Sequence, residues 1–151
     1  EEEFVIVQRV TGPAVTVSAV ATTDQLAALQ RVCREVYVDP SLIQYAVRLV
    51  SATRTPEKHD LKELARFITY GASPRATINL TEGSRALAML RGRTYVLPED
   101  MTDLVPDVLR HRLVLSYEAL SEGLTADAVI AKITAKIPAP AKPLEHEKLA
   151  A

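Results

Sequence analysis

The stretch "SPRATINLTEGSRALAMLRG", residues 73–92, decides the fold because it carries signals for both ends of a helix. Ser73 is a residue type preferred at an N-cap, Pro74 suits the first helical position, and Gly92 suits the residue after a helix. Between them, side chains recur at helical spacing and are predicted to face inward: Leu80, Ser84, Leu87 and Leu90. The stretch therefore predicts one long helix that packs against others.

Arg75 is the unusual residue of this helix because it puts a positive charge in the first turn. The aligned peptide dipoles make that end of a helix positive, so a cation there costs about 0.3–1 kcal/mol unless an anion is near. Gly71 permits a tight turn before it and Pro74 restricts the chain. A guanidinium at a helix N-terminus is suited to phosphate oxygens, although many exposed arginines are only solvated.

Further helices are predicted on both sides of residues 73–92. Capping signals at Thr22, Asp39, Pro98 and Thr125 open segments with helical periodicity: residues 22–36, 39–50, 98–109 and 125–137. We expect Pro106 to kink or divide the third of these segments. Residues 60–68 fit either a short helix or the start of a strand, and residues 11–20 suggest a short extended segment with alternating valines.

The inward side of the segment 39–50 is predicted to contain Leu42, Ile43, Ala46, Val47, Leu49 and Val50. Together the segments predict an all-α protein, a small helical bundle with at most one short two-stranded hairpin.

The composition agrees with a helical globular protein. The 151 residues are 48% hydrophobic and 25% charged, and only 5% are aromatic, which disfavours a β-sandwich. The net charge of -1 gives no support for nucleic-acid or membrane binding by the whole molecule. No apolar run approaches the roughly 20 residues that cross a bilayer. Cys33 is the sole cysteine, so no internal disulfide can form, and we expect a cytoplasmic protein.

No complete enzyme site is visible in the sequence. No glycine-rich stretch precedes a Lys-Ser or Lys-Thr pair, so the chain lacks a P-loop. The histidines and Cys33 have no partner at zinc spacing, and we expect no metal site: His59, His111 and His146. The carboxylates after Pro98 are those that favour a helix N-terminus, which is a simpler role than metal binding: Glu99, Asp100 and Asp103.

Three motifs in one order resemble the C-terminal lid of the MoxR family of AAA+ ATPases. They are "GASPRA" at residues 71–76, "GRTYVLPED" at residues 92–100 and "LRHRL" at residues 109–113. The pieces "VYVDPSLIQYAVRLVSATR" and "ADAVIAKITAKIPAP" resemble the same lid, so the similarity extends over about residues 20–140.

This resemblance implies a role for Arg75 as the second sensor arginine, which reaches the γ-phosphate of ATP bound between the core and the lid. Ser73 and Pro74 would hold the arginine, and Tyr45, with Ile43, would help to wall the adenine. The catalytic residue implied is therefore Arg75, and the cofactor-binding residues are Arg75, Ser73 and Tyr45. ATP with Mg²⁺ would be the cofactor of the full-length parent.

The resemblance also implies an organisation for the chain. Residues 1–20 would be a remnant of the preceding ATPase core and its linker, residues 21–138 the lid, and residues 139–151 a disordered tail in part derived from cloning. Without the P-loop of the core, this fragment should fold but not hydrolyse ATP or bind a cofactor tightly. Its partners would be its own core domain, neighbouring subunits of a ring and an unknown client of a chaperone-like assembly.

Two other classes of function stay open on the sequence. A winged-helix-like nucleic-acid module would use the arginine-rich middle of the chain: Arg85, Arg91, Arg93, Arg110 and Arg112. These arginines are interleaved with carboxylates, which favours an ordinary mixed-charge surface. A free-standing helical interaction domain would instead use exposed apolar surface. For His111 and Arg112, contact with the last carbonyls of a helix is the simplest role, and a subunit contact is the alternative.

Overall fold

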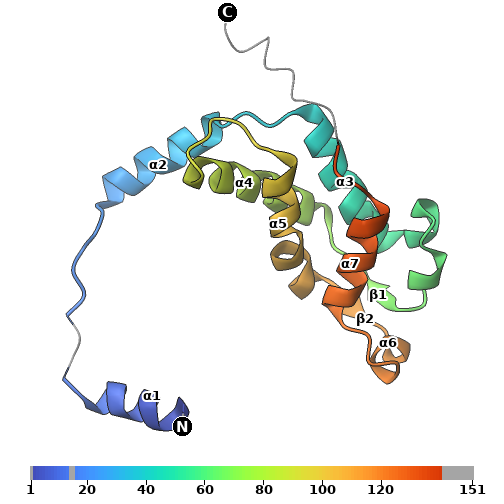
Figure 1. Ribbon diagram of the computed structural model, residues 1–151, viewed down its shortest axis with the longest axis horizontal. Helices are drawn as coiled ribbons and strands as arrows, with labels where there is room; N and C mark the ends of the chain where they lie inside the picture. The colour runs from blue at the N-terminus through green and yellow to red at the C-terminus, as the bar shows by residue number, and fades with distance from the viewer. Residues whose placement is uncertain (1, 14–15, 141–151) are drawn as a thin grey trace, which may run out of the picture. The chain divides into compact units, whose positions relative to one another are not determined.

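The computed structural model describes residues 2–13 and 16–140, and it divides the chain into two compact units, Glu1–Arg31 and Val32–Ala151. The first unit contains α1 (Glu2–Thr11) and most of α2 (Thr23–Glu35), and neither helix has a buried residue (Figure 1). The predicted tail, residues 139–151, lies outside the described residues from residue 141 onward.

Helix α2 begins as predicted, with a reciprocal capping box. The Thr22 N–H donates to Gln25 Oε1 (2.8 Å), and the Gln25 N–H donates to Thr22 Oγ1 (3.2 Å). Its apolar residues are half exposed: Leu26, Leu29 and Val32. Residues 16–22, for which the valines suggested an extended segment, form no strand.

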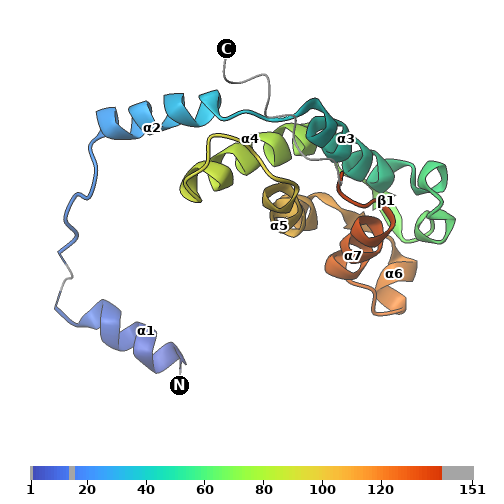
Figure 2. The ribbon, with the colours of Figure 1, turned by 45° about the horizontal axis from the view of Figure 1, so that its top comes forward.

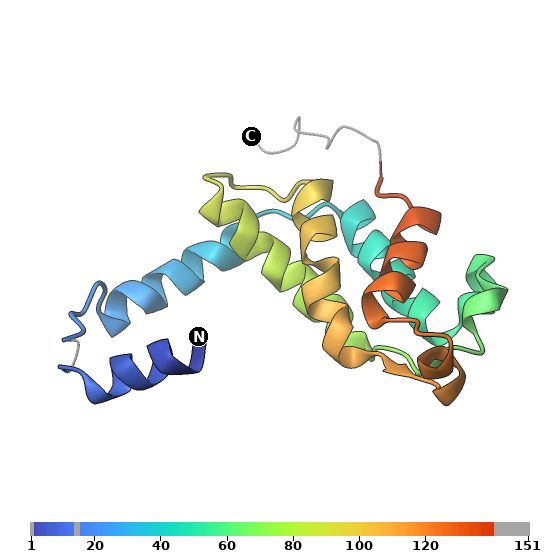
Figure 3. The ribbon, with the colours of Figure 1, turned by 60° about the horizontal axis from the view of Figure 1, so that its bottom comes forward.

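The second unit is a helical bundle, which confirms the predicted all-α class. It consists of α3 (Pro40–Arg54), α4 (Pro74–Leu90), α5 (Pro98–Leu109), the short α6 (Tyr117–Ser121) and α7 (Ala126–Lys136). Helix α5 packs across α4, and α7 lies beside α3 and α5 (Figures 1 and 3). Helix α5 continues through Pro106 as one helix and is not divided there.

Short elements connect the helices at one end of the bundle. Two 3₁₀ turns, η1 (Pro56–His59) and η2 (Lys62–Leu64), lead from α3 to β1 (Ile68–Tyr70). A third 3₁₀ turn, η3 (Arg110–Arg112), leads from α5 to β2 (Val114–Leu115), which lies directly before α6 (Figure 1). Figure 2 shows α6 beside α7.

The two strands pair antiparallel, but they are not the hairpin that the sequence suggested. Ile68 is paired with Leu115 and Tyr70 with Val114, and both α4 and α5 lie between the strands in the chain. The predicted short two-stranded element is therefore present, but two helices connect its strands in place of a hairpin turn.

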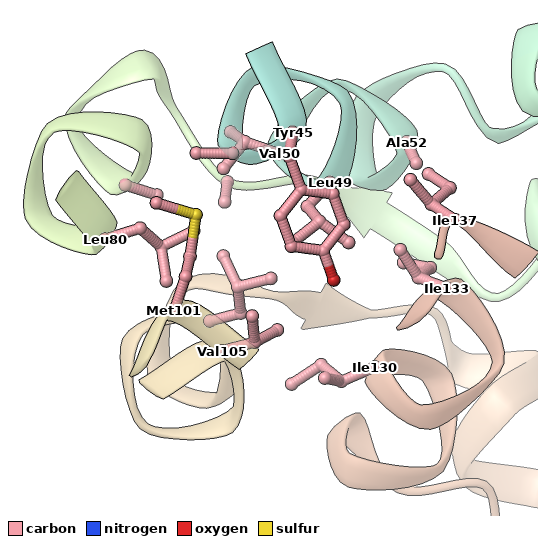
Figure 4. Packing of buried hydrophobic residues seen from close by; sticks show 14 of the residues in the cluster. Tyr45, Leu49, Val50, Ala52, Leu80, Met101, Val105, Ile130, Ile133 and Ile137 are labelled. Atoms are coloured by element: carbon pink, nitrogen blue, oxygen red, sulfur yellow. The ribbon is translucent and has the colours of Figure 1, made fainter. Parts of the chain in front are cut away.

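The core of the second unit extends from Val36 to Ile137 and is filled from all the longer helices. Figure 4 shows Tyr45 and Leu49 of α3 packed among Met101 and Val105 of α5 and Ile133 of α7. Three positions predicted inside are exposed instead: Ile43, Val47 and Leu90. In α3 the buried stripe is shifted around the helix and takes in Tyr45.

Candidate functional site

The start of α4 places Arg75 in the first turn, as predicted. Ser73 occupies the N-cap with an extended backbone, and Pro74 is the first helical residue. The Ser73 side chain makes no capping hydrogen bond, unlike the expected cap, while its carbonyl accepts from the Ala76 N–H (2.9 Å). The Ser73 hydroxyl and the Arg75 side chain are both exposed at this helix end.

The segment that enters α4 is fixed to the end of α3 by close backbone contact. The Ala72 N–H donates to Thr53 Oγ1 (2.9 Å), and Arg54 Nη1 donates to the Ala72 carbonyl. A Cβ on Gly71 would lie 2.2 Å from the Thr53 carbonyl oxygen. Gly71 is therefore required for close approach of two backbones, whereas the sequence had suggested a tight turn.

Arg75 stands on this anchored segment without a charge partner. Within residues 2–13 and 16–140, its guanidinium makes no hydrogen bond and no ion pair. Five other arginines of the bundle differ, since carboxylates face Arg66, Arg85, Arg91, Arg93 and Arg110. The positive charge of Arg75 thus adds to the positive end of the helix dipole, an arrangement suited to a bound anion.

Tyr45 does not lie where the predicted adenine contact needs it. Its side chain is 0% exposed, and its hydroxyl points into the core between α5 and α7 (Figure 4). Burial raises the pKa of its phenol, an effect that the charge of Arg48 partly opposes. Complete burial leaves no Tyr45 surface for a nucleotide, so the inward turn of this residue corrects the sequence interpretation.

Ile43, the other residue considered for the adenine wall, is exposed on the same helix. It lines a shallow groove of about 190 Å³ between α3 and α4, together with Thr77, Ile78, Thr81 and Glu82. Ile78 of this groove lies three residues after Arg75, about one helical turn along the same face of α4. An apolar and hydroxyl-lined surface therefore adjoins the charged helix end.

The motif "GRTYVLPED" connects α4 to α5, and its side chains fix this connection by hydrogen bonds. Asp100 is fully buried and accepts two hydrogen bonds from Arg93 (2.6 and 2.7 Å) and one from Arg91 (2.8 Å). It also accepts from the N-cap Leu97 N–H (2.8 Å). Burial opposes ionisation of this carboxyl, but the donors outweigh burial and lower the pKa of Asp100.

The motif "LRHRL" forms η3, whose side chains reach three different helices. Arg110 Nε donates to Asp127 of α7 (2.7 Å), and His111 Nδ1 lies 3.1 Å from the Asp107 carbonyl of α5. With its amide oriented to suit both neighbours, Asn79 of α4 accepts from Arg112 Nη2 (2.7 Å) and donates to the Arg75 carbonyl (3.2 Å). Sequence reasoning missed Asn79, although its spacing of one helical turn from Arg75 was a usable signal.

Comparison with known proteins agrees with this architecture. The family model described as the AAA lid domain matches residues 63–133. Chaperone MoxR1 of Mycobacterium tuberculosis (strain ATCC 25618 / H37Rv) is 37% identical over 140 residues, which are 93% of this chain and 37% of that protein. Protein MoxR of Paracoccus denitrificans is 38% identical over 111 residues, or 70% of this chain and 32% of that protein.

A solved structure extends the likeness to three dimensions. The crystal structure of a protein from Cytophaga hutchinsonii ATCC 33406, described as a candidate ATPase, superposes with a TM-score of 0.81 at 34% identity. The match covers 91% of this chain and 42% of that one. The chain is the lid of a MoxR-family AAA+ ATPase. It spans about a third to two fifths of the length of these relatives.

The charges of this MoxR-family lid do not form a free basic face in the arginine-rich middle. Carboxylates pair with four of the five arginines of that alternative, Arg85, Arg91, Arg93 and Arg110, and Arg112 is the exception among the described residues. Such neutralised arginines are poor contacts for a phosphate backbone. The pairing therefore disfavours the nucleic-acid alternative.

No group of three His, Cys, Asp or Glu side chains that could hold a metal ion exists among residues 2–13 and 16–140. Across the same residues, no helix has the length and apolar character of a membrane span. His146 lies outside the described residues, so its place in the lid is not described.

Proposed function

We propose that Arg75 of this lid senses the terminal phosphate of ATP held by a core ATPase domain of the same protein. The observation that carries the proposal is the exposed guanidinium of Arg75, which has no carboxylate partner in the described chain and stands at the positive end of α4. An unpaired cation in this place is unfavourable in the lid alone. Its cost is offset when an anion is bound between core and lid.

Several residues around Arg75 fit this role. Ser73 has an exposed hydroxyl that is not used as a cap and can donate to an anion. Gly71 and Thr53 fix the chain just before the helix, so the backbone at Arg75 is held in place while its guanidinium group is free to bind. Ile43 and the groove along α4 replace Tyr45 as the apolar surface for a base.

MgATP, when bound, supplies the phosphoryl group that is transferred to water. The part of this lid is to place a fixed positive charge where negative charge develops during transfer, which lowers the barrier without rearrangement. The same contact would link the nucleotide state to the angle of the lid. This fragment carries no P-loop, so we expect both effects only in the longer protein.

The assembly is proposed by similarity alone. One relative is named as a chaperone, Chaperone MoxR1. By that similarity, the full protein would form a ring whose neighbouring subunits contact this lid, and would act in the cytoplasm on a client protein.

Substitution of Arg75 in the full-length protein tests the proposal. We expect Arg75→Ala to lower kcat for ATP hydrolysis by about 100-fold, as for other preorganised charge stabilisers. The melting temperature should stay the same or rise slightly, because Arg75 is exposed, has no partner among the described residues and is unfavourable at the helix start. Arg66→Ala, which removes an exposed ion pair with Glu118, serves as the matched control and should keep full turnover. Unchanged turnover in Arg75→Ala would exclude the sensor role.

A further inference from the structure

Arg112 is an arginine with an unusual environment in this lid. Its Nε is buried and has no hydrogen-bond partner within the described residues, and no carboxylate there pairs with it. A partly buried guanidinium normally has a carboxylate or several acceptors, because burial without them is costly. With the Asn79 amide oriented to suit both of its neighbours, its oxygen is the acceptor of Arg112 Nη2 (2.7 Å).

Asn79 carries this contact to the backbone of Arg75. The two residues are one turn apart on α4, and Asn79 Nδ2 donates to the Arg75 carbonyl (3.2 Å). The Arg112 contact fixes which way the Asn79 amide faces, since its oxygen must point to the guanidinium. The backbone near Arg75 is thus held by η3 through Asn79, and by the end of α3 through Ala72.

The turn that carries Arg112 is itself fixed in place. Arg110 in η3 is paired with Asp107 and with Asp127 of α7, and the His111 ring lies 3.1 Å from the Asp107 carbonyl. No carboxylate of the described residues forms an ion pair with Arg112, so this arginine does not serve as one half of a salt bridge. The three residues connect α4, α5 and α7 at the end of the bundle where Arg75 stands.

We propose that Arg112 is a positioning residue for Arg75 and acts through the Asn79 amide. Ala72 and Thr53 hold the chain before Arg75, and Asn79 and Arg112 hold the turn after it. A charge that must reach a phosphate oxygen works only from a fixed base, because small displacements of a catalytic group lower the rate steeply. This inference rests on the proposed function of Arg75, and it gives "LRHRL" a purpose that composition did not reveal.

Double-mutant cycles in the full-length protein test this inference. Arg112→Ala and Asn79→Ala should each lower kcat for ATP about tenfold and leave KM within about twofold, because the sensor is displaced while binding continues. Arg112→Lys should recover a large part of kcat, since an ammonium can still donate to the Asn79 oxygen. Arg66→Ala is again the matched surface control, and thermal melting checks that every variant is folded.

The pairwise variants separate the possible results. Arg75→Ala with Arg112→Ala should lose no more turnover than Arg75→Ala alone, and Asn79→Ala with Arg112→Ala no more than Asn79→Ala alone. Additive losses in either pair, or full kcat in Arg112→Ala, overturn the inference while the sensor role stands. Full kcat in Arg75→Ala overturns the proposed function itself.

Discussion

Gly71 shows how one residue sets the place of the candidate site. Sequence reasoning found this glycine but assigned it to a tight turn. The structure shows no left-handed backbone there, and the reason is instead the lack of room beside the Thr53 carbonyl, at the end of α3. Such a contact between residues far apart in sequence has no local pattern, so sequence alone could give the residue and not its cause.

Gly71→Ala should therefore be strongly destabilising. The added methyl would lie 2.2 Å from the Thr53 carbonyl oxygen, and both partners are backbone, so the entry to α4 must move. We expect a loss of about 3 kcal/mol in the free energy of unfolding, at the upper end for overpacking. Gly123→Ala is the matched control: it has open space at φ +67 and should cost only about 1 kcal/mol of backbone strain. Urea denaturation measures both, and equal losses would contradict the close-approach argument.

Tyr45 supports a second prediction at the residue scale. Its hydroxyl is buried and has no hydrogen-bond partner in the described part of the chain. Because an unpaired buried hydroxyl costs about 1–3 kcal/mol, Tyr45→Phe should be neutral or stabilising. Tyr45→Ala should lose about 3–5 kcal/mol through the cavity that it leaves. A loss above about 1 kcal/mol in Tyr45→Phe would reveal a partner for the hydroxyl, and thermal unfolding distinguishes these results.

At the scale of elements, local signals predicted where the helices begin and end better than which of their residues face the core. The caps at Thr22, Asp39 and Thr125 all accept the expected backbone N–H groups, because capping depends on neighbours in the chain. In α3 the prediction was right at four buried positions and wrong at Ile43 and Val47, because only packing against α5 and α7 selects Tyr45 for the core. The pairing of β1 with β2 was missed for the same reason, as it is fixed by the helices between them.

The connection between α4 and α5 gives a prediction that depends on pH. Asp100→Asn removes the negative charge that Arg91 and Arg93 share. The NH₂ group of the new amide would face either the Leu97 N–H or an arginine, and one of these hydrogen bonds would be lost. We expect a loss of about 3 kcal/mol at neutral pH, as for other broken buried pairs. Urea denaturation at pH 7 measures it.

The sign of the pH effect follows from the lowered pKa of Asp100. The stabilisation is present above the unfolded value of about 3.9 and is lost as the pH falls through the folded pKa. The difference between wild type and Asp100→Asn should thus shrink from pH 7 to pH 3. An unchanged difference would show that the carboxylate charge does not hold this connection.

At the scale of the whole molecule, the sequence located the exposed arginine of the candidate site but not the residues that contact its helix from other elements. Arg75 and Ser73 were found because helix starts have local signatures. Asn79 and Arg112 were not joined, since their contact crosses from α4 to η3 and needs the packed bundle. The division into two units also had no clear signal, because α2 has a good amphipathic pattern and yet no buried residue.

The distribution of buried residues predicts that stability belongs to the second unit. No described residue before Val36 is buried, whereas α7 contributes Val129, Ile130 and Ile133 to the core. Deletion of residues 1–21 should therefore change the melting temperature by less than about 2 °C, the effect expected of surface changes. Deletion from residue 126 onward should prevent folding, because three buried aliphatic side chains at about 1.5–3 kcal/mol each approach the whole stability of a domain. Calorimetry of both truncations decides the point, and a fall of more than about 5 °C in the first would show that residues 1–21 add to the fold despite their exposure.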